Sequence, residues 1–333
     1  MKEYLNILFS GKSLNRTEAE QAMNSIIEGN ALPEQVSAFL GALRVKGETV
    51  EEIVGFAKSI RANAVNIQTK HRYLTDVCGT GGDGTNTFNI STAAAFVIAG
   101  TGIPVGKHGN IAVSSKCGSA DVLKALGVKI DFTPEKITGI INEIGIGFLF
   151  APLFHPAMKN VAPIRKAIGL RTVFNMLGPL CNPAGVKRQI IGVYDKNLIG
   201  LIAAALIELE CEEAMVLSSD DGMDEISLSA KTEIAHVKDG KVLRFTVSSE
   251  DFGCSPSSIE NLKGGDAVEN AVTIENILKG EKGPKRDIVL MNAAAAIKVS
   301  GIINDLKTGV QVAEEAINSG KAFNKLEQLR YYQ

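Results

Sequence analysis

The chain has 333 residues, of which 45% are hydrophobic and 22% are charged, and its formal net charge is −2. These values exclude a disordered chain and predict one large domain with a smaller one. The near-neutral charge argues against nucleic acid or an anionic membrane surface as a partner. The five cysteines lack C-x-x-C spacing and no uncharged apolar run is long enough to span a membrane, so we expect free thiols in a cytoplasmic protein.

The first seventy residues contain only helical patterns. We expect a short amphipathic helix over residues 4–9, followed by a helix that a capping box at Thr17–Glu20 opens. Pro33 suits the first turn of a third helix, which Gly47 ends. A second capping box at Thr49–Glu52 opens a fourth helix. These signals predict a small all-helical domain.

From residue 73 onward, strand and helix patterns alternate, which predicts parallel β-α-β units. The expected helices cover 92–99, 120–126 after Ser119, 133–145, 198–209, 267–278, 288–299 and 305–319. The expected strands cover 73–77, 103–106, 128–131, 146–150, 189–194 and 214–218, with a hairpin formed by 232–236 and 241–246.

The fold class that follows is α/β, with a small helical domain beside a large domain built on a central, mainly parallel sheet. We expect the small domain over residues 1–70 and the large domain over 71–154 and 186–333. Helical signals interrupted by prolines from about 155 to 185 indicate that the chain returns to the small domain there.

The segment from Asp76 to Thr92 combines four glycines with hydroxyl, amide and carboxylate side chains, and then enters an apolar helix pattern. Glycines allow close backbone approach, and the first amides of a helix are free donors, so we expect an anion site, most often for phosphate. Gly79–Gly84 matches the spacing of dinucleotide-binding turns, but Asp83 would then face the pyrophosphate, and the Gly-Lys-Ser/Thr of a P-loop is absent. A plain structural turn is the remaining alternative.

A second polar loop follows the next expected strand, with Lys-His-Gly-Asn at 107–110 and a serine-rich stretch at 114–119. Carboxyl ends of parallel strands meet at one edge of a sheet, so both loops should share a crevice. Lys107 offers a cationic donor and Ser119 a hydroxyl group to phosphate. Taken alone, Ser119 is more simply a helix N-cap and His108 a structural residue.

Asp224 and Glu225 follow an apolar strand in an acidic turn. In a loop both carboxylates can face one hard cation, and Mg²⁺ typically takes one or two carboxylates together with substrate phosphate oxygens. Asp220 and Asp221 compete for this role. Without a phosphate site nearby, a solvated acidic loop would be the better interpretation.

Met158, Ala162 and Arg165 share one helical face by their spacing. An arginine there can bind a carboxylate through two hydrogen bonds. The alternative is a surface arginine whose stem covers apolar neighbours.

Taken together and in order, these motifs resemble the anthranilate phosphoribosyltransferases of tryptophan biosynthesis. The resemblance covers essentially the whole chain and rests on Gly79–Asp83, Asn89–Thr92, Lys107–Asn110, Ser119, Arg171–Leu180 and Asp224–Glu225. It implies a nucleoside phosphorylase/phosphoribosyltransferase-like fold, Mg²⁺ as cofactor and usually a homodimer. The implied reaction transfers phosphoribose from phosphoribosyl pyrophosphate to the amino nitrogen of anthranilate and releases pyrophosphate.

The resemblance also implies roles for individual residues, although it names no general base. Phosphoribosyl pyrophosphate contacts fall on Gly79, Gly82, Asp83, Thr87, Asn89, Ile90, Ser91, Thr92, Lys107, His108, Gly109, Asn110, Ser114, Ser115 and Ser119. Mg²⁺ contacts fall on Ser91, Asp224 and Glu225. Anthranilate contacts fall on Gly79, Asn110, His155 and Arg165, with Met158 at a position often aromatic in relatives.

Two alternatives remain at this stage. A nucleoside phosphorylase on the same architecture would use free phosphate, but its family lacks this combination of motifs. A catalytically silent paralogue that binds nucleic acid would show a basic stripe and eroded loop residues. The net charge of −2 and the presence of Asp83, Ser91, Asp224 and Glu225 weigh against it.

Overall fold

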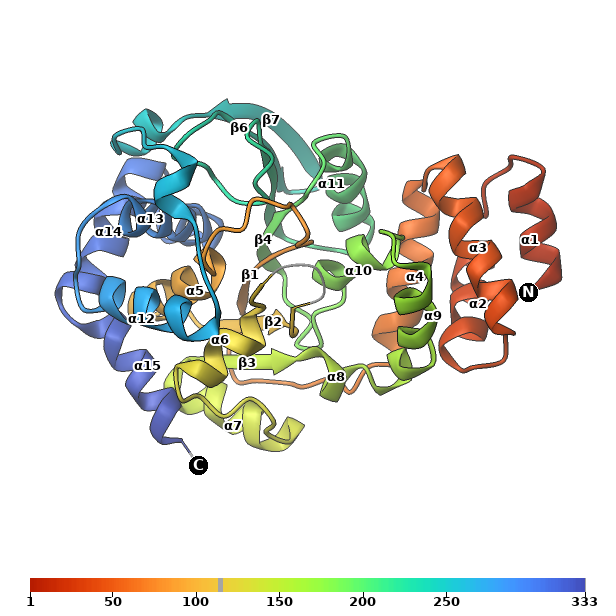
Figure 1. The fold of residues 1–333 in the computed structure, drawn as a ribbon, viewed down its shortest axis with the longest axis horizontal. Helices are drawn as coiled ribbons and strands as arrows, with labels where there is room; N and C mark the ends of the chain where they lie inside the picture. Colours follow the sequence, from red (N-terminus) through yellow and green to blue (C-terminus); the bar gives the residue numbers. More distant parts are fainter. Residues whose placement is uncertain (113–115, 333) are drawn as a thin grey trace.

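The computed structural model describes residues 1–112 and 116–332. A bundle of helices stands beside a larger body built around one sheet, and the N-terminus lies at the far end of the bundle (Figure 1). Within the described part of the chain, no helix has the length and apolar character needed to cross a membrane. The α/β fold class predicted above is confirmed.

The bundle begins with four helices: α1 (Lys2–Phe9), α2 (Arg16–Ile27), α3 (Pro33–Lys46) and α4 (Val50–Ala62). The capping box at Thr49 and Glu52, the proline at the start of α3 and Gly47 at its end are confirmed. The predicted capping box at Thr17–Glu20 is wrong. Asn15, in an extended backbone conformation, caps α2 and exchanges hydrogen bonds with Glu18 at 2.9 and 2.8 Å.

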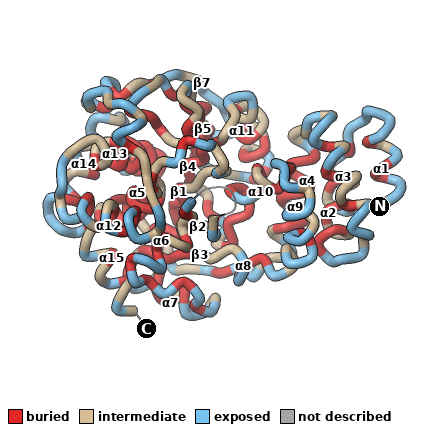
Figure 2. Tube along the Cα trace, viewed as in Figure 1, coloured by how far each residue is buried: buried red, intermediate tan, exposed pale blue. Residues whose placement is uncertain are grey.

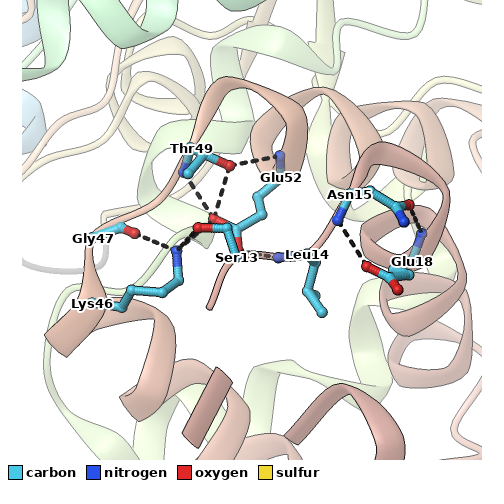
Figure 3. A network of polar contacts seen from close by, with 8 residues as sticks. All are labelled: Ser13, Leu14, Asn15, Glu18, Lys46, Gly47, Thr49 and Glu52. Carbon is cyan, nitrogen blue, oxygen red and sulfur yellow. Dashed lines mark hydrogen bonds and ion pairs between the residues drawn. The ribbon is translucent and has the colours of Figure 1, made fainter. Parts of the chain in front are cut away.

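The carboxylate of Glu52 lies fully buried between the helices of the bundle. It accepts hydrogen bonds from the amides of Leu14 and Thr49 at 3.0 and 2.8 Å and pairs with Lys46 at 2.9 Å (Figure 3). The hydroxyl of Thr49 adds a fourth donor at 3.1 Å. One side chain therefore ties the segment before α2 to the turn between α3 and α4.

The sheet has seven strands in the order β3-β2-β1-β4-β5-β6-β7. The first five run parallel, whereas β6 and β7 form the predicted antiparallel hairpin. Their bounds are β1 (Thr75–Gly79), β2 (Val105–Gly109), β3 (Ile146–Phe150), β4 (Arg188–Gly192), β5 (Glu213–Ser219), β6 (Thr232–Lys238) and β7 (Lys241–Val247).

Helices cover the sheet and enclose its core, which Figure 2 shows as continuous buried chain around β1, β4 and α5. They are α5 (Ile90–Gly100), α6 (Ser119–Ala125), α7 (Pro134–Ile144), α11 (Leu198–Glu208), α12 (Ala267–Leu278), α13 (Pro284–Val299), α14 (Leu306–Asn318) and α15 (Lys321–Tyr331), with short 3₁₀ turns η2 (Ser249–Phe252) and η3 (Ile259–Leu262). The five cysteines are free thiols, as expected.

After β3 the chain passes back to the bundle through α8 (Ala151–Phe154), η1 (Pro156–Asn160), α9 (Ala162–Ile168) and α10 (Phe174–Leu180). The side-chain amide of Asn160 donates to the carbonyl of Ile27 at 2.7 Å, and the guanidinium of Arg61 donates to the carbonyl of Leu180 at 2.6 Å. Apolar side chains of this passage join those of α2, α3 and α4 in one cluster. The domain boundaries near 70, 155 and 185 stay a prediction.

Three further expectations about single elements are wrong. Residues 128–131 form no strand: Val128 and Ile130 are buried and alternate with exposed neighbours, but this segment pairs with no strand of the sheet. The strand expected at 103–106 begins at Val105, so Lys107 and His108 belong to β2. Helix α15 was not anticipated, and Gly118 rather than Ser119 is the N-cap of α6.

Candidate active site

The candidate site lies where the strand order reverses, between β1 and β4. Gly79 and Gly192 are paired residues at the carboxyl ends of these strands. In open α/β sheets, ligands bind in the crevice outside such a switch point. The glycine loop that follows β1 and the acidic turn that follows β5 meet at this crevice.

Both terminal glycines are required by the position of Asp224. A Cβ atom on Gly79 would lie 2.2 Å from the Oδ2 atom of Asp224, and one on Gly192 would lie 1.6 Å from its carbonyl oxygen. No larger residue fits at either strand end without moving the acidic turn. The sheet therefore holds the Asp224 carboxylate directly over the switch point.

The two predicted metal ligands face the glycine loop and the start of α5. Asp224 accepts a hydrogen bond from the amide of Gly81 at 2.8 Å, and Glu225 accepts one from the amide of Ser91 at 3.2 Å. Burial raises the pKa of both carboxyl groups. Repulsion by Asp83 raises the pKa of Asp224 further, and repulsion by Asp224 does the same for Glu225. Adjacent buried carboxyl groups with so few donors are suited to bind a cation.

Lys107 approaches the same carboxylates from β2. Its ammonium group is buried and donates to the carbonyl of Val77 at 2.6 Å and to the hydroxyl of Ser91 at 3.3 Å. Its charge lowers the pKa values of Asp224 and Glu225, in opposition to burial. In this structure Lys107 therefore holds the Ser91 hydroxyl in place by a hydrogen bond.

Three of the four glycines in this loop, Gly81, Gly82 and Gly84, have positive φ, which glycine adopts without strain, whereas Gly79 ends strand β1. Within the loop, Asp83 accepts a hydrogen bond from the amide of Thr85 at 3.2 Å. The loop then enters α5, whose first amides lie beside Glu225.

Two of the residues assigned to the donor have buried side chains. Ile90 and Thr92 are each 1% exposed within the core under α5. These positions can offer a ligand only their backbone amides, whereas the hydroxyl of Ser91 stands at the crevice.

The second half of the glycine loop is held from α12. The side-chain amide of the buried Asn270 donates to the side-chain oxygen of Asn89 at 3.1 Å. The side-chain amide of Asn89 in turn donates to the carbonyl of Cys117 at 3.1 Å. Thr87 forms an isolated β-bridge with Lys263. This chain of contacts joins the loop after β1 to the loop after β2.

The competing acids of the turn are engaged elsewhere. Asp221 accepts hydrogen bonds from the hydroxyls of Ser227 and Ser229. Asp220 is exposed and lies 3.9 Å from Lys196. The geometry thus favours Asp224 and Glu225 over both neighbours.

The donor set fits Mg²⁺ that arrives with a phosphate ligand. Asp224 and Glu225 are adjacent, and Glu225 contacts the amide of Ser91, whose hydroxyl is held by Lys107. Among the described residues, no three His, Cys, Asp or Glu side chains form a complete metal cage. Mg²⁺ is usually bound by one or two carboxylates plus substrate phosphate oxygens.

A pocket of about 300 Å³ opens beside the crevice, between β2 and the passage back to the bundle. It is lined mainly by apolar groups and contains three of the four residues assigned to anthranilate: Asn110, His155 and Arg165. Met158 also lines it, whereas Gly79 lies at the crevice and not among the lining residues. The fold thus brings these side chains together from the loop after β2, the junction of α8 with η1, η1 itself and α9.

Two cationic side chains line this pocket, the exposed Lys159 and the half-buried Arg165. The guanidinium of Arg165 lies 5.3 Å from the centre of the Phe174 ring, and burial lowers its pKa. Among the described residues, no Asp or Glu pairs with it. A half-buried guanidinium without a carboxylate partner is suited to bind one from a ligand.

Two histidines form the inner wall of the pocket, with ring centres 5.2 Å apart. Burial lowers the pKa of His108 to about 3 and that of His155 to about 4, so both rings are neutral at pH 7. The Nδ1 atom of His108 lies 3.2 Å from the carbonyl of Gly178. Because a carbonyl can only accept, this contact assigns the proton of the neutral ring to Nδ1 and leaves Nε2 as an acceptor, with no partner among the described residues.

The loop after β2 is described only in part. Ser114 and Ser115 lie outside the described residues. The hydroxyl of Ser119 donates to the carbonyl of Asn110 at 3.3 Å, and a Cβ atom on Gly109 would lie 2.2 Å from that hydroxyl. Ser119, Gly109 and Asn110 are therefore adjacent at the mouth of both sites.

Sequence reasoning missed several residues of the site. Phe174 and Gly178 line the pocket, and Arg171 donates a hydrogen bond to the carbonyl of Gly82. All three lie in the Arg171–Leu180 motif, which carried the resemblance without any assigned role. Asn270 had no sequence signal, because an asparagine within a helix is common on surfaces.

Family models match both parts of the chain. The model described as the glycosyl transferase family, a/b domain, matches residues 71–323, and the one described as the helical bundle domain matches residues 2–64. The anthranilate phosphoribosyltransferase of Thermoanaerobacter sp. (strain X514) is 52% identical over 333 residues, covering all of this chain and 98% of the relative. The chain belongs to the anthranilate phosphoribosyltransferase family.

Solved structures agree with this family. The enzyme from Thermus thermophilus has a TM-score of 0.94 and 39% identity, with 99% of this chain and 98% of that chain covered. The Saccharomyces cerevisiae enzyme in complex with PRPP and Mg has a TM-score of 0.91 and 32% identity, with coverage of 99% and 97%. The resemblance seen in the motifs is thereby confirmed.

Proposed function

We propose that this protein transfers the phosphoribosyl group of phosphoribosyl pyrophosphate to the amino nitrogen of anthranilate, giving N-(5-phosphoribosyl)anthranilate and pyrophosphate. One observation carries this proposal: the glycine loop packs against two adjacent buried carboxylates, and beside it lies a pocket whose Arg165 pairs with no Asp or Glu of the described residues. The yeast relative was crystallised with PRPP and Mg, which supports the same donor here.

The donor site in this proposal consists of the glycine loop, the start of α5 and the loop after β2. Backbone amides of the loop and of the first turn of α5 bind phosphate oxygens at the positive end of the helix dipole, although those of Gly81 and Ser91 donate to Asp224 and Glu225 in this structure. The carboxylate of Asp83 faces the ribose hydroxyls or water bound to the metal.

Ser91, Asp224 and Glu225 would hold Mg²⁺ on the pyrophosphate. Bound there, the ion would neutralise charge that develops on the leaving group. Both carboxyl groups have raised pKa values because of burial and mutual repulsion, and a divalent cation relieves that repulsion.

The acceptor site is the 300 Å³ pocket. Arg165 binds the carboxylate of anthranilate, and Asn110 at the pocket mouth orients the ring toward the donor. His108 and His155 are neutral and Lys159 is exposed, so the half-buried Arg165 is the main electrostatic anchor for the substrate carboxylate.

The chemistry requires positioning more than a strong base. An aromatic amine is neutral at pH 7 and can attack C1 of the ribose as pyrophosphate leaves, and its proton is lost afterwards. Holding the amine in line with C1 lowers the activation barrier, because the entropy cost of bringing the two groups into this geometry is met on binding. The pocket and the crevice enclose the reacting atoms between two parts of the molecule, which limits attack by water.

A homodimer and a cytoplasmic location belong to the same proposal. The homodimer is supported by the resemblance to the family, and the location by five free cysteines. Sedimentation of the purified protein at micromolar concentration tests the dimer, and a monomer would exclude it.

The activity is tested by mixing the protein with anthranilate, phosphoribosyl pyrophosphate and Mg²⁺ and following the loss of anthranilate fluorescence. We expect a loss that requires all three components. Phosphate-dependent cleavage of a nucleoside, with no use of anthranilate, would instead establish the phosphorylase alternative. No Mg²⁺-dependent loss of fluorescence would refute the proposed function.

A further inference from the structure

Arg171 stands in the turn between α9 and α10, outside the residue sets assigned above. Its guanidinium donates a hydrogen bond to the carbonyl of Gly82 and stacks on the ring of Tyr194, 4.2 Å from its centre. The residue is exposed, and among the described residues no Asp or Glu pairs with it. A permanent cation thus rests on a main-chain oxygen of the donor loop.

Tyr194 is itself fastened to that loop. Its amide donates to the hydroxyl of Thr80 at 3.1 Å, and the amide of Thr80 donates to the carbonyl of Gly192 at 2.9 Å. Arg171 therefore holds the glycine loop at two places, directly at Gly82 and through Tyr194 near the end of β1.

The same turn reaches the acceptor pocket. Arg165 lies in α9, before the turn, and its guanidinium packs on Phe174, which begins α10 directly after the turn. The amide of Thr172 donates to the side chain of Asn175 at 3.0 Å, which fixes the turn as it enters α10. A displacement of Arg165 or Phe174 by a ligand must therefore move Arg171 or strain this short turn.

We propose that Arg171 is a positioning residue that couples the acceptor pocket to the donor loop. Occupancy of the pocket fixes the turn, the turn fixes Arg171, and Arg171 holds Gly82 so that the loop amides and Asp83 are ready for the donor. Coupling of this kind is reciprocal, so each ligand tightens the binding of the other. The identity of the two ligands rests on the proposed function.

A purely structural role for Arg171 is disfavoured by its surroundings. Its side chain is exposed, so truncation leaves no cavity and no buried charge, and exposed residues of this kind contribute little to stability. The effect of its removal should therefore appear in binding and not in melting.

The test measures the dissociation constant of anthranilate by its fluorescence, with and without saturating pyrophosphate and Mg²⁺. Pyrophosphate carries no ribose, so no turnover interferes. We expect Mg²⁺–pyrophosphate to tighten anthranilate binding by about fivefold or more in the wild type. In Arg171→Ala this factor should fall to about one, with an unchanged melting temperature.

Three further variants keep the inference falsifiable. Arg171→Lys keeps the charge but loses the planar stack on Tyr194, so it should restore part of the coupling and also serves if the alanine variant does not fold. Tyr194→Phe keeps the ring and should couple as the wild type does. The matched control is Leu170→Ala, because Leu170 is the exposed neighbour and should leave coupling intact.

A wild-type factor of one, or a wild-type factor retained in Arg171→Ala, would overturn the inference. Failure of the proposed function looks different, because the wild type would then show no Mg²⁺-dependent turnover of anthranilate with phosphoribosyl pyrophosphate. Turnover with normal coupling in Arg171→Ala would leave the function standing and remove Arg171 from it.

Discussion

Carboxyl groups are buried in two regions of the molecule, and the two regions differ in how many hydrogen-bond donors surround them. In the helical bundle, Glu52 is fully buried and receives four hydrogen-bond donors, one of them the ammonium group of Lys46 (Figure 3). Beyond the carboxyl ends of the central strands, Asp224 and Glu225 are adjacent and accept hydrogen bonds from the amides of Gly81 and Ser91. The first region satisfies its charge, whereas in the second burial and mutual repulsion raise the pKa values of two adjacent carboxyl groups.

This difference separates stability from function. A buried carboxylate with a full set of donors holds segments together, and its removal leaves those donors unpaired. A pair of carboxylates with few donors destabilises the empty site and gains from a cation. Burial alone does not mark the active site; the deficit of partners does.

The largest expected effect is on catalysis, from the double variant Asp224→Asn with Glu225→Gln. Loss of both metal contacts should lower kcat/KM by about a thousandfold, since metal stabilisation is worth several kcal/mol. Steady-state rates at several Mg²⁺ concentrations measure it. The matched control is Asp220→Asn in the same turn, whose carboxylate is exposed and which should keep its activity. An unchanged dependence of the rate on Mg²⁺ concentration in the double variant would show that Asp224 and Glu225 do not bind the metal.

Glu52→Ala should show the opposite behaviour. It leaves Lys46 and the amide of Leu14 without their buried partner, so we expect a loss of about 3–5 kcal/mol in the free energy of unfolding. Urea denaturation measures it, and the folded fraction should retain its turnover. Glu51→Ala is the control on the same helix, because its exposed pair with Arg16 should contribute less than about 1 kcal/mol. Equal losses in both variants would contradict the role of Glu52.

The pH dependence of stability sharpens the comparison inside the pocket. Burial lowers the pKa of His155 from 6.5 to about 4, so the unfolded chain takes up a proton first as the pH falls. Stability that is present above pH 6.5 is therefore lost between about 6.5 and 4, by roughly 3 kcal/mol. Melting curves of His155→Gln should be flatter than those of the wild type over this range. Parallel curves would show that the pKa of His155 does not differ between the folded and the unfolded protein.

The smallest of these effects concerns substrate affinity. Arg165→Ala should raise the KM of anthranilate by about tenfold, the loss expected for one hydrogen-bonded charge pair, with little change in the KM of the donor. Initial rates with each substrate varied in turn measure both constants. Lys166→Ala, at the exposed neighbouring position, should change neither. A larger rise for the donor would reject the assigned role of Arg165.

Much of this fold could be predicted because local signals coincided with tertiary structure. Pro33, Gly47 and the Thr49–Glu52 capping box bound real helices, and strand β3 has the predicted limits. Residues 128–131 misled because alternating burial also arises where a loop packs on a core. At Asn15, a side chain two positions before the expected cap reached the helix amides first.

The site was predicted less completely, because its residues depend on contacts between distant segments. The glycine loop and the acidic turn each carried a pattern, yet only the fold shows that Gly79 and Gly192 make room for Asp224. The separation of Asp224 from Asp221 depends on the hydroxyl of Ser227, which no spacing reveals.

The most direct test of the contrast between the two regions is thermal stabilisation by phosphoribosyl pyrophosphate with Mg²⁺. Tight binding to the folded state raises Tm. We predict a clear rise in the wild type, the same rise from a lower starting Tm in Glu52→Gln, and none in the Asp224→Asn, Glu225→Gln double variant. A full rise in the double variant, or its loss in Glu52→Gln, would contradict the assignment of the cation site to the sheet edge.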